Sequence, residues 1–212
     1  MSHDFGAMFA VHDAVRRDLA RTVSLTGGTS PVPAERADAL RARWALLHGV
    51  VAAHELAEDQ ALWPRLREAV PAEESGPFEV AAEQQDALFD ALDRTTELLA
   101  GAQALSDRSS REELTAAAER SAVLADQHFG LEERRLLPLV AAWLDPSDWT
   151  AFVTAWAADP GPGGTAQVLP FLLDGAHPDR AASVLGRLDD GQRTQYAEKW
   201  RPAYRASTAD LW

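Results

Sequence analysis

The chain has 212 residues, of which 46% are hydrophobic and 25% charged, and it has no cysteine. This length supports one domain, or one domain with an extension, and the lack of cysteine excludes disulfides, cysteine nucleophiles and thiolate metal sites. The formal net charge of −13 disfavours nucleic-acid binding, because an acidic surface repels phosphate backbones. The sequence has no apolar run of membrane-spanning length and no signal-peptide pattern at its start, so we expect a soluble, cytoplasmic protein that binds neither nucleic acid nor membranes.

Residues 1–144 have the pattern of four amphipathic helices, because apolar residues recur at steps of three and four. We expect these helices at about 4–23, at about 34–70, from 78 to about 99, and from the capping segment 106–110 to about 144. Breaks rich in glycine, proline and serine separate them, and alternating β-branched runs are missing. Short breaks between long helices favour antiparallel neighbours, so the predicted fold is all-α, an up-down antiparallel four-helix bundle.

Residues 145–212 have a different pattern. Asp145 followed by Pro146 is typical of a helix start, a second short helix is expected from Pro178, and a last one near 190–206. These pieces are too short to form a core of their own. We therefore predict two parts, a bundle over 1–144 and a short helical extension over 145–212 that packs on it.

A repeated motif lies in the second and fourth predicted helices. The segment from His54 to Pro64 and the segment from His128 to Pro138 both read H-x-x-x-E-[DE]-x-x-L-[WL]-P, 74 residues apart. The repeat predicts two helical hairpins related by a pseudo-twofold axis, with both prolines kinking or ending their helices. The first and third helices then align as well, and Gln85 occupies the position equivalent to His12.

The repeat places acids and imidazoles where apolar residues are expected. A histidine and a glutamate four positions apart lie on one helix face, and here that face points into the core. Unpaired buried carboxylates are costly and repel one another, whereas cations between them remove the repulsion. The pattern predicts a metal site formed by His12, His54, Glu58, His128 and Glu132.

The third helix contributes a weaker candidate ligand to this site. Gln85 offers a neutral amide oxygen, which binds iron or zinc less well than imidazole does. Glu55 and Asp86 are alternative ligands on that side, and each is also compatible with a solvated position.

Residues 1–144 resemble the hemerythrin-like (HHE cation-binding) family. The resemblance rests on His12, on HELAED (54–59) before LWP, and on HFGLEE (128–133) before LLP. It implies a non-haem diiron centre, with His12, His54 and His128 as terminal ligands and Glu58 and Glu132 as bridging carboxylates. The family commonly has a histidine where this chain has Gln85, and often a second histidine where it has Glu55, so we expect one of the two iron sites to be altered.

Three functions fit this sequence. The first is an iron protein that binds dioxygen, peroxide or nitric oxide, or that senses or stores iron. The second is a diiron oxidase or peroxidase acting on an organic substrate, which predicts a cavity beside Gln85 that the extension helps to shape. The third is a metal-poor interaction module that uses the tryptophan-rich extension as its contact surface.

Overall fold

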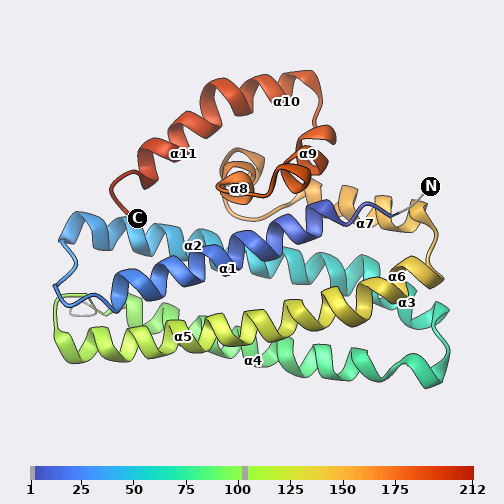
Figure 1. Cartoon of the computed structure of the whole chain (residues 1–212), viewed down its shortest axis with the longest axis horizontal. Coiled ribbons are helices and arrows are strands. Elements are labelled where there is room, and N and C mark those ends of the chain that lie inside the picture. The colour runs from blue at the N-terminus through green and yellow to red at the C-terminus, as the bar shows by residue number, and fades with distance from the viewer. Residues whose placement is uncertain (1–2, 102–104) are drawn as a thin grey trace.

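A computed structural model describes residues 3–101 and 105–212, which are helical and include no strand. Helix α1 packs against α2 and α5, and α4 packs against α5 and α2. Consecutive long helices run in opposite directions (Figure 1). The predicted all-α class is confirmed. The four long helices are α1 (Gly6–Thr26), α2 (Ala34–Ala57), α4 (Gly76–Ala100) and α5 (Arg108–Leu131).

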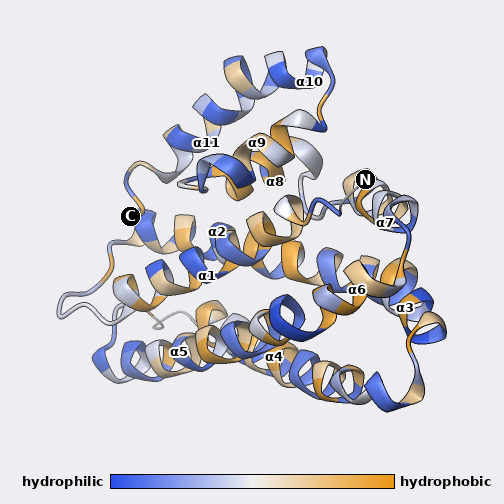
Figure 2. Cartoon of the chain, turned by 45° about the vertical axis from the view of Figure 1, so that its right-hand side comes forward, coloured by the Kyte–Doolittle hydropathy of each residue, from blue (hydrophilic) through white to orange (hydrophobic). Residues whose placement is uncertain are grey.

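The long helices are amphipathic, and their apolar sides form the core. Apolar and polar residues alternate along each of them (Figure 2). Leu19 of α1, Leu40 of α2, Leu92 of α4 and Leu114 of α5 are fully buried together in one cluster. Helix α5 begins where the serine-rich segment predicted a cap, because the Asp107 side chain accepts a hydrogen bond from the backbone N–H of Ser110 at 2.8 Å.

Both halves of the sequence repeat fold in the same way. Helix α2 continues through a π-helical turn (Glu58–Leu62) into α3 (Trp63–Ala69). Helix α5 likewise continues through a π-helical turn (Glu132–Leu136) into α6 (Leu137–Trp143). The three pieces have 24, 5 and 7 residues in each half. A short 3₁₀ turn (Ala72–Glu74) precedes α4.

Proline accounts for these π-helical turns. Pro64 and Pro138 each stand two residues after such a turn and have no N–H to donate. The residue before each proline donates instead to the carbonyl five positions back, from Trp63 to Glu58 and from Leu137 to Glu132. The helices therefore continue past both prolines rather than ending there, and the wider π turn opens at a glutamate in each half.

The C-terminal residues form shorter helices on one side of the bundle (Figure 1). Helix α7 packs against α2, helices α8 and α9 pack against α1, and α11 packs against α8. No helix in the described part of the chain is long and apolar enough to cross a membrane. These helices are α7 (Pro146–Ala158), α8 (Gly164–Leu173), α9 (Pro178–Gly186), α10 (Asp190–Gln195), a π-helical turn (Tyr196–Trp200) and α11 (Arg201–Thr208).

Buried polar contacts join α11 to the bundle. Arg43 of α2 donates hydrogen bonds both to Asp18 of α1 and to the hydroxyl of Tyr204 in α11. The Tyr204 hydroxyl donates in turn to Asp174, at 3.1 Å. Asp18 and Arg43 are both buried, so each charge has a partner of opposite sign where water is excluded.

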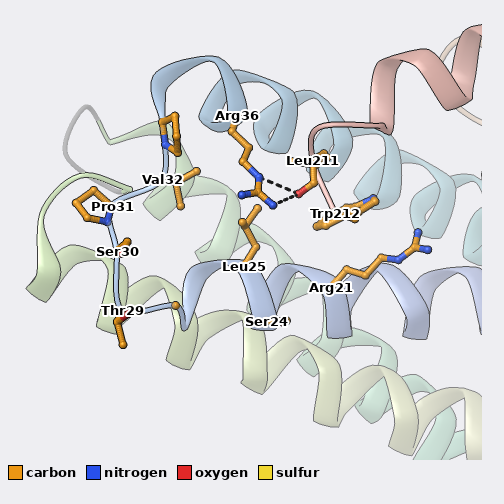
Figure 3. A pocket seen from close by; sticks show the side chains of 12 residues that line it. Arg21, Ser24, Leu25, Thr29, Ser30, Pro31, Val32, Arg36, Leu211 and Trp212 are labelled. Atoms are coloured by element: carbon orange, nitrogen blue, oxygen red, sulfur yellow. Dashed lines mark hydrogen bonds between the residues drawn. The ribbon is translucent and has the colours of Figure 1, made fainter.

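The last residues of the chain lie over the start of α2. Arg36 donates two hydrogen bonds to the carbonyl oxygen of Leu211, at 3.1 and 3.0 Å (Figure 3). The guanidinium of Arg21 lies 5.7 Å from the ring centroid of Trp212, within the range of a cation–π contact. A cavity of about 510 Å³ opens between these groups and the loop that joins α1 to α2.

Candidate metal centre

Six side chains with nitrogen or oxygen donors meet in the core between α1, α2 and α5. Each is at most 1% exposed. The structure therefore brings together all five ligands predicted as the main set, together with Glu55, which the sequence left as an alternative. We call this set the buried cluster, and its members are His12, His54, Glu55, Glu58, His128 and Glu132.

One end of the buried cluster is built around His12. Its Nε2 atom lies 3.1 Å from His54 Nε2 and 3.3 Å from Glu132 Oε2. His54 Nε2 also lies 3.5 Å from Glu58 Oε1. His12, His54 and Glu132 offer donor atoms that lie within 4.8 Å of one another, and His54, Glu55 and Glu58 form a second such group.

The other end is built around His128, with Glu132 common to both ends. His128 Nε2 lies 3.1 Å from Glu55 Oε2 and 3.3 Å from Glu132 Oε1. The distance between Glu55 Oε2 and His128 Nε2 equals the distance between His12 Nε2 and His54 Nε2 at the first end, 3.1 Å in both cases. The Glu132 carboxylate directs one oxygen toward each end, which is the position that a carboxylate bridging two ions occupies.

The donor set fits a pair of cations. Both carboxylate oxygens of Glu58 and of Glu132 are buried and have no hydrogen-bond partner among the described residues, a costly state for a polar atom. Ligand atoms about 2.0–2.2 Å from one ion lie roughly 3 Å apart when their bonds are at right angles, close to the separations of 3.1 and 3.3 Å found at both ends. Imidazole nitrogen and carboxylate oxygen are ligands that iron, manganese and zinc accept.

Without metal, the buried cluster shifts the protonation of its own members. Burial lowers the pKa of His12 to about 4, and burial together with the nearby His12 lowers the pKa of His54 to about 3. Burial, with a contribution from the Glu55 charge, raises the pKa of Glu132 to about 8, and burial next to Glu132 raises the pKa of Glu58 well above its usual range. Burial opposes protonation of His128, but the carboxylates of Glu132 and Glu55 outweigh it and raise the pKa of His128 to about 9.

The pKa shifts predict how the stability of the metal-free protein changes with pH. Glu132 and His128 both have raised pKa values in the folded state, so between pH 6.5 and 8 the folded chain holds protons that the unfolded chain has released. The free energy of unfolding must then fall as pH rises through this window. We expect chelator-treated protein to melt at a lower temperature at pH 8 than at pH 6.5.

Bound cations reverse this dependence, because they replace the protons. The increase in melting temperature caused by metal should therefore be larger at pH 8 than at pH 6.5, as measured by circular dichroism. A metal-free protein whose melting temperature rises between pH 6.5 and 8 would contradict the assigned protonation states.

Of the three histidines in the buried cluster, only His12 has a hydrogen-bond partner among the described residues on Nδ1, the ring nitrogen that faces away from the cluster. Its Nδ1 lies 2.9 Å from Glu133 Oε1, and Arg16 donates to the same oxygen at 2.6 Å. The Nδ1 atoms of His54 and His128 have no hydrogen-bond partner in the described part of the chain. A carboxylate at Nδ1 fixes the ring so that Nε2 faces the ligand site. The signal for this role in the sequence is weak: Glu133 follows directly after the predicted ligand Glu132.

Replacing Glu133 by glutamine tests this orientation. We expect the Glu133→Gln variant to bind metal about 10- to 100-fold more weakly, because the amide is a poorer acceptor for the His12 N–H and no longer pairs with Arg16. Competition with a chelator of known affinity measures the change. Asp126→Asn is the matched control, since Asp126 also pairs with Arg16 but does not contact His12. Equal affinities in the two variants would exclude the proposed orientation.

A contact of the same kind occurs at the equivalent positions in the other half of the sequence repeat. Gln85 occupies the position of His12, and Asp59 occupies the position of Glu133. Gln85 Nε2 donates to Asp59 Oδ2 at 2.9 Å. Gln85 is half-buried, Asp86 is exposed, and neither belongs to the groups of converging donor atoms. Asp59 is thus present as the carboxylate that would pair with a histidine at position 85, and in this chain the Gln85 amide nitrogen donates to it instead.

Aromatic rings enclose the buried cluster. Phe129, fully buried, stacks on His12 with ring centroids 4.3 Å apart and an interplanar angle of 8°. Trp156 of α7 meets His54 edge-on, with centroids 6.1 Å apart. Our sequence analysis assigned neither ring to the site. Phe129 could have been noticed as the residue after His128, but no local pattern links Trp156 to a motif a hundred residues earlier.

Comparison with known proteins bears on the identity of this centre. A search of curated proteins and a search of solved structures each gave no match. The family model described as the hemerythrin HHE cation binding domain matches residues 3–140. This range covers α1 to α5 and every member of the buried cluster. The chain therefore belongs to the hemerythrin HHE cation-binding family.

Proposed function

We propose that this protein holds two non-haem iron ions in the buried cluster and binds a small ligand there, namely dioxygen, peroxide or nitric oxide. The observation that carries the proposal is the set of buried, unpartnered carboxylate oxygens on Glu58 and Glu132. Imidazole nitrogens lie 3.3 to 3.5 Å from these oxygens, a separation that allows a nitrogen and an oxygen to bind the same cation. A structural role alone does not explain why so many acids stand in an apolar core.

The residues divide between the two ions according to their contacts. His12 and His54 would hold one ion and His128 and Glu55 the other, with Glu132 shared between them. Glu58, next to His54, supplies a further carboxylate. Iron would supply redox chemistry and a coordination position for the small ligand.

The remaining residues prepare the site for such a ligand. Phe129 covers the His12 ring and excludes water from it. Glu133 holds the proton on His12 Nδ1, so that the opposite nitrogen is free to bind. We also propose that the four long helices form an up-down bundle, that residues 145–212 are an extension of it, and that the protein acts in the cytoplasm without nucleic acid or membrane as partner.

Metal analysis tests the proposal. Protein purified from iron-replete cells should contain two irons per chain, and peroxide or azide should produce a ligand-to-iron charge-transfer band. The His54→Ala variant should lose iron and the band, whereas His48→Ala should keep both, since His48 contacts exposed Asp93 rather than the buried cluster. Protein that binds no metal would favour an interaction module, and protein that holds only zinc would exclude the redox function.

A diiron oxidase or peroxidase acting on an organic substrate is a second candidate. One observation favours it: Trp156, whose ring contacts His54, also lines a cavity of mostly apolar side chains. The cavity is not lined by Gln85, where the sequence analysis expected it. Turnover of an organic compound with peroxide by the iron-loaded protein would support this candidate over simple ligand binding.

A further inference from the structure

The two ends of the buried cluster offer different donor atoms. The end around His12 offers two imidazole nitrogens and one carboxylate, from His12, His54 and Glu132. The end around His128 offers one imidazole nitrogen and two carboxylates, from His128, Glu55 and Glu132. One end is therefore richer in nitrogen ligands and the other is richer in oxygen ligands.

This difference does not depend on where Glu58 binds. Glu58 converges with His54 and Glu55, which are members of different ends. A neutral imidazole offers one free nitrogen to one ion, whereas a carboxylate can bridge two ions. The two ends share only the carboxylate of Glu132, and together they use all three imidazoles of the buried cluster. Whichever ion Glu58 joins, the first end keeps two nitrogen ligands and the second end keeps one.

The surroundings of the imidazoles strengthen the difference. His12 Nδ1 lies 2.9 Å from Glu133 Oε1, and a carboxylate at this position makes the opposite ring nitrogen a stronger metal ligand. The Nδ1 atom of His128 has no hydrogen-bond partner anywhere in the described ranges. The His12 end thus has more nitrogen ligands, and one of them is made more basic by its neighbour.

We propose that the two ends prefer different divalent cations. The His12 end prefers an ion that favours imidazole, such as zinc or ferrous iron, and the His128 end prefers an ion that favours carboxylate, such as manganese. The inference rests on the proposed occupancy of the buried cluster by two ions, but it does not depend on iron or on redox chemistry. An excess of iron still fills both ends. When metals compete, the preference produces a centre with one ion of each kind.

Zinc and manganese test this preference without redox chemistry. Metal-free full-length protein receives one equivalent of zinc and is then titrated with manganese, and electron paramagnetic resonance of free manganese measures how much binds. Sites of nitrogen and oxygen generally bind zinc more tightly than manganese, so manganese should remain only where nitrogen ligands are fewest. We expect one manganese beside one zinc in each chain. Pulsed electron paramagnetic resonance should show one coordinated imidazole nitrogen on the manganese, as His128 supplies, rather than two.

Replacing Glu55 by histidine tests the source of the preference. Glu55→His exchanges an oxygen donor for a nitrogen donor at the His128 end. Manganese should then bind to the protein with one zinc at least about tenfold more weakly, the smallest change typical of residues behind metal ligands. Leu56→His is the matched control, because Leu56 is the next residue of α2 and its side chain is 56% exposed, so the added imidazole lies outside the buried cluster. Circular dichroism checks that both variants are folded.

The outcomes separate this inference from the proposed function. Failure of manganese to bind beside zinc, two imidazole nitrogens on the bound manganese, or an unchanged manganese affinity in folded Glu55→His would overturn the inference. If the parent protein still takes up a second zinc, the two-ion centre remains in place. Protein that binds neither zinc nor manganese would overturn the two-ion occupancy itself and the proposed function with it.

Discussion

The Glu132→Gln variant should lose both metal ions, with an affinity reduced by more than about 100-fold. Glu132 is the one carboxylate whose two oxygens face both ends of the buried cluster, at 3.3 Å from His12 Nε2 and 3.3 Å from His128 Nε2. An amide keeps the size of the side chain, but it carries no charge and offers one weak oxygen ligand. Residues that hydrogen-bond to metal ligands typically change metal affinity by about 10- to 100-fold when they are mutated. Loss of a ligand that is shared by two ions should reduce the affinity by more than this.

The same substitution should have the opposite effect on the metal-free protein. Without cations, the Glu132 carboxylate is buried next to Glu58 and without a hydrogen-bond partner, so a neutral amide relieves an unfavourable charge. We expect metal-free Glu132→Gln to melt at the same temperature as the metal-free parent protein or at a higher one at pH 8. Added metal should then raise the melting temperature of the parent alone.

Plasma emission spectroscopy and thermal melts followed by circular dichroism measure these two effects. Glu119→Gln is the matched control, since Glu119 lies in α5, the helix that leads into the turn with Glu132, but is exposed. A Glu132→Gln protein that keeps two ions, or that gains as much stability from metal as the parent does, would exclude a shared carboxylate at this position.

The sequence predicted the helices well because their cause is local. Apolar residues at steps of three and four determine which helix faces are buried, and the prolines and serines at the breaks mark where helices start. The burial of the five side chains predicted as the main ligand set could be predicted for the same reason, since a charged or imidazole side chain in an apolar stripe must point inward. The membership of the family, suggested by these motifs, is confirmed by the match over residues 3–140.

Features that depend on contacts between distant segments could not be predicted in this way. Pro64 and Pro138 indicated kinks or ends, and the sequence pattern did not show that a π-helical turn before each proline lets the helix continue. Trp156 reaches His54 because α7 folds back along α2, which no local pattern encodes. Glu55 is buried because of the way α2 is rotated about its own axis near its C-terminal end. A rotation equivalent to one residue would turn this side chain toward solvent.

The Glu55→Gln variant should hold one ion instead of two. Glu55 Oε2 pairs with His128 Nε2 at 3.1 Å. Glu55 also converges with His54 and Glu58, but it does not belong to the group formed by His12, His54 and Glu132. Removing its charge should weaken metal binding most at the His128 end, because the group formed by His12, His54 and Glu132 does not include Glu55. Metal quantification by plasma emission spectroscopy, repeated over a range of free-metal concentrations, should show a single remaining ion.

Adding Gln85→His to the Glu55→Gln variant should restore the second ion. By the sequence repeat, position 85 corresponds to His12. Asp59 is already in place to accept the Nδ1 proton of a histidine there, as Glu133 does for His12. Asp86→His in the same background is the control, because it adds an imidazole at an exposed neighbouring position. If Asp86→His restored the ion equally well, or if Glu55→Gln alone kept two ions, then Glu55 would not be the ligand that replaces the missing histidine of α4.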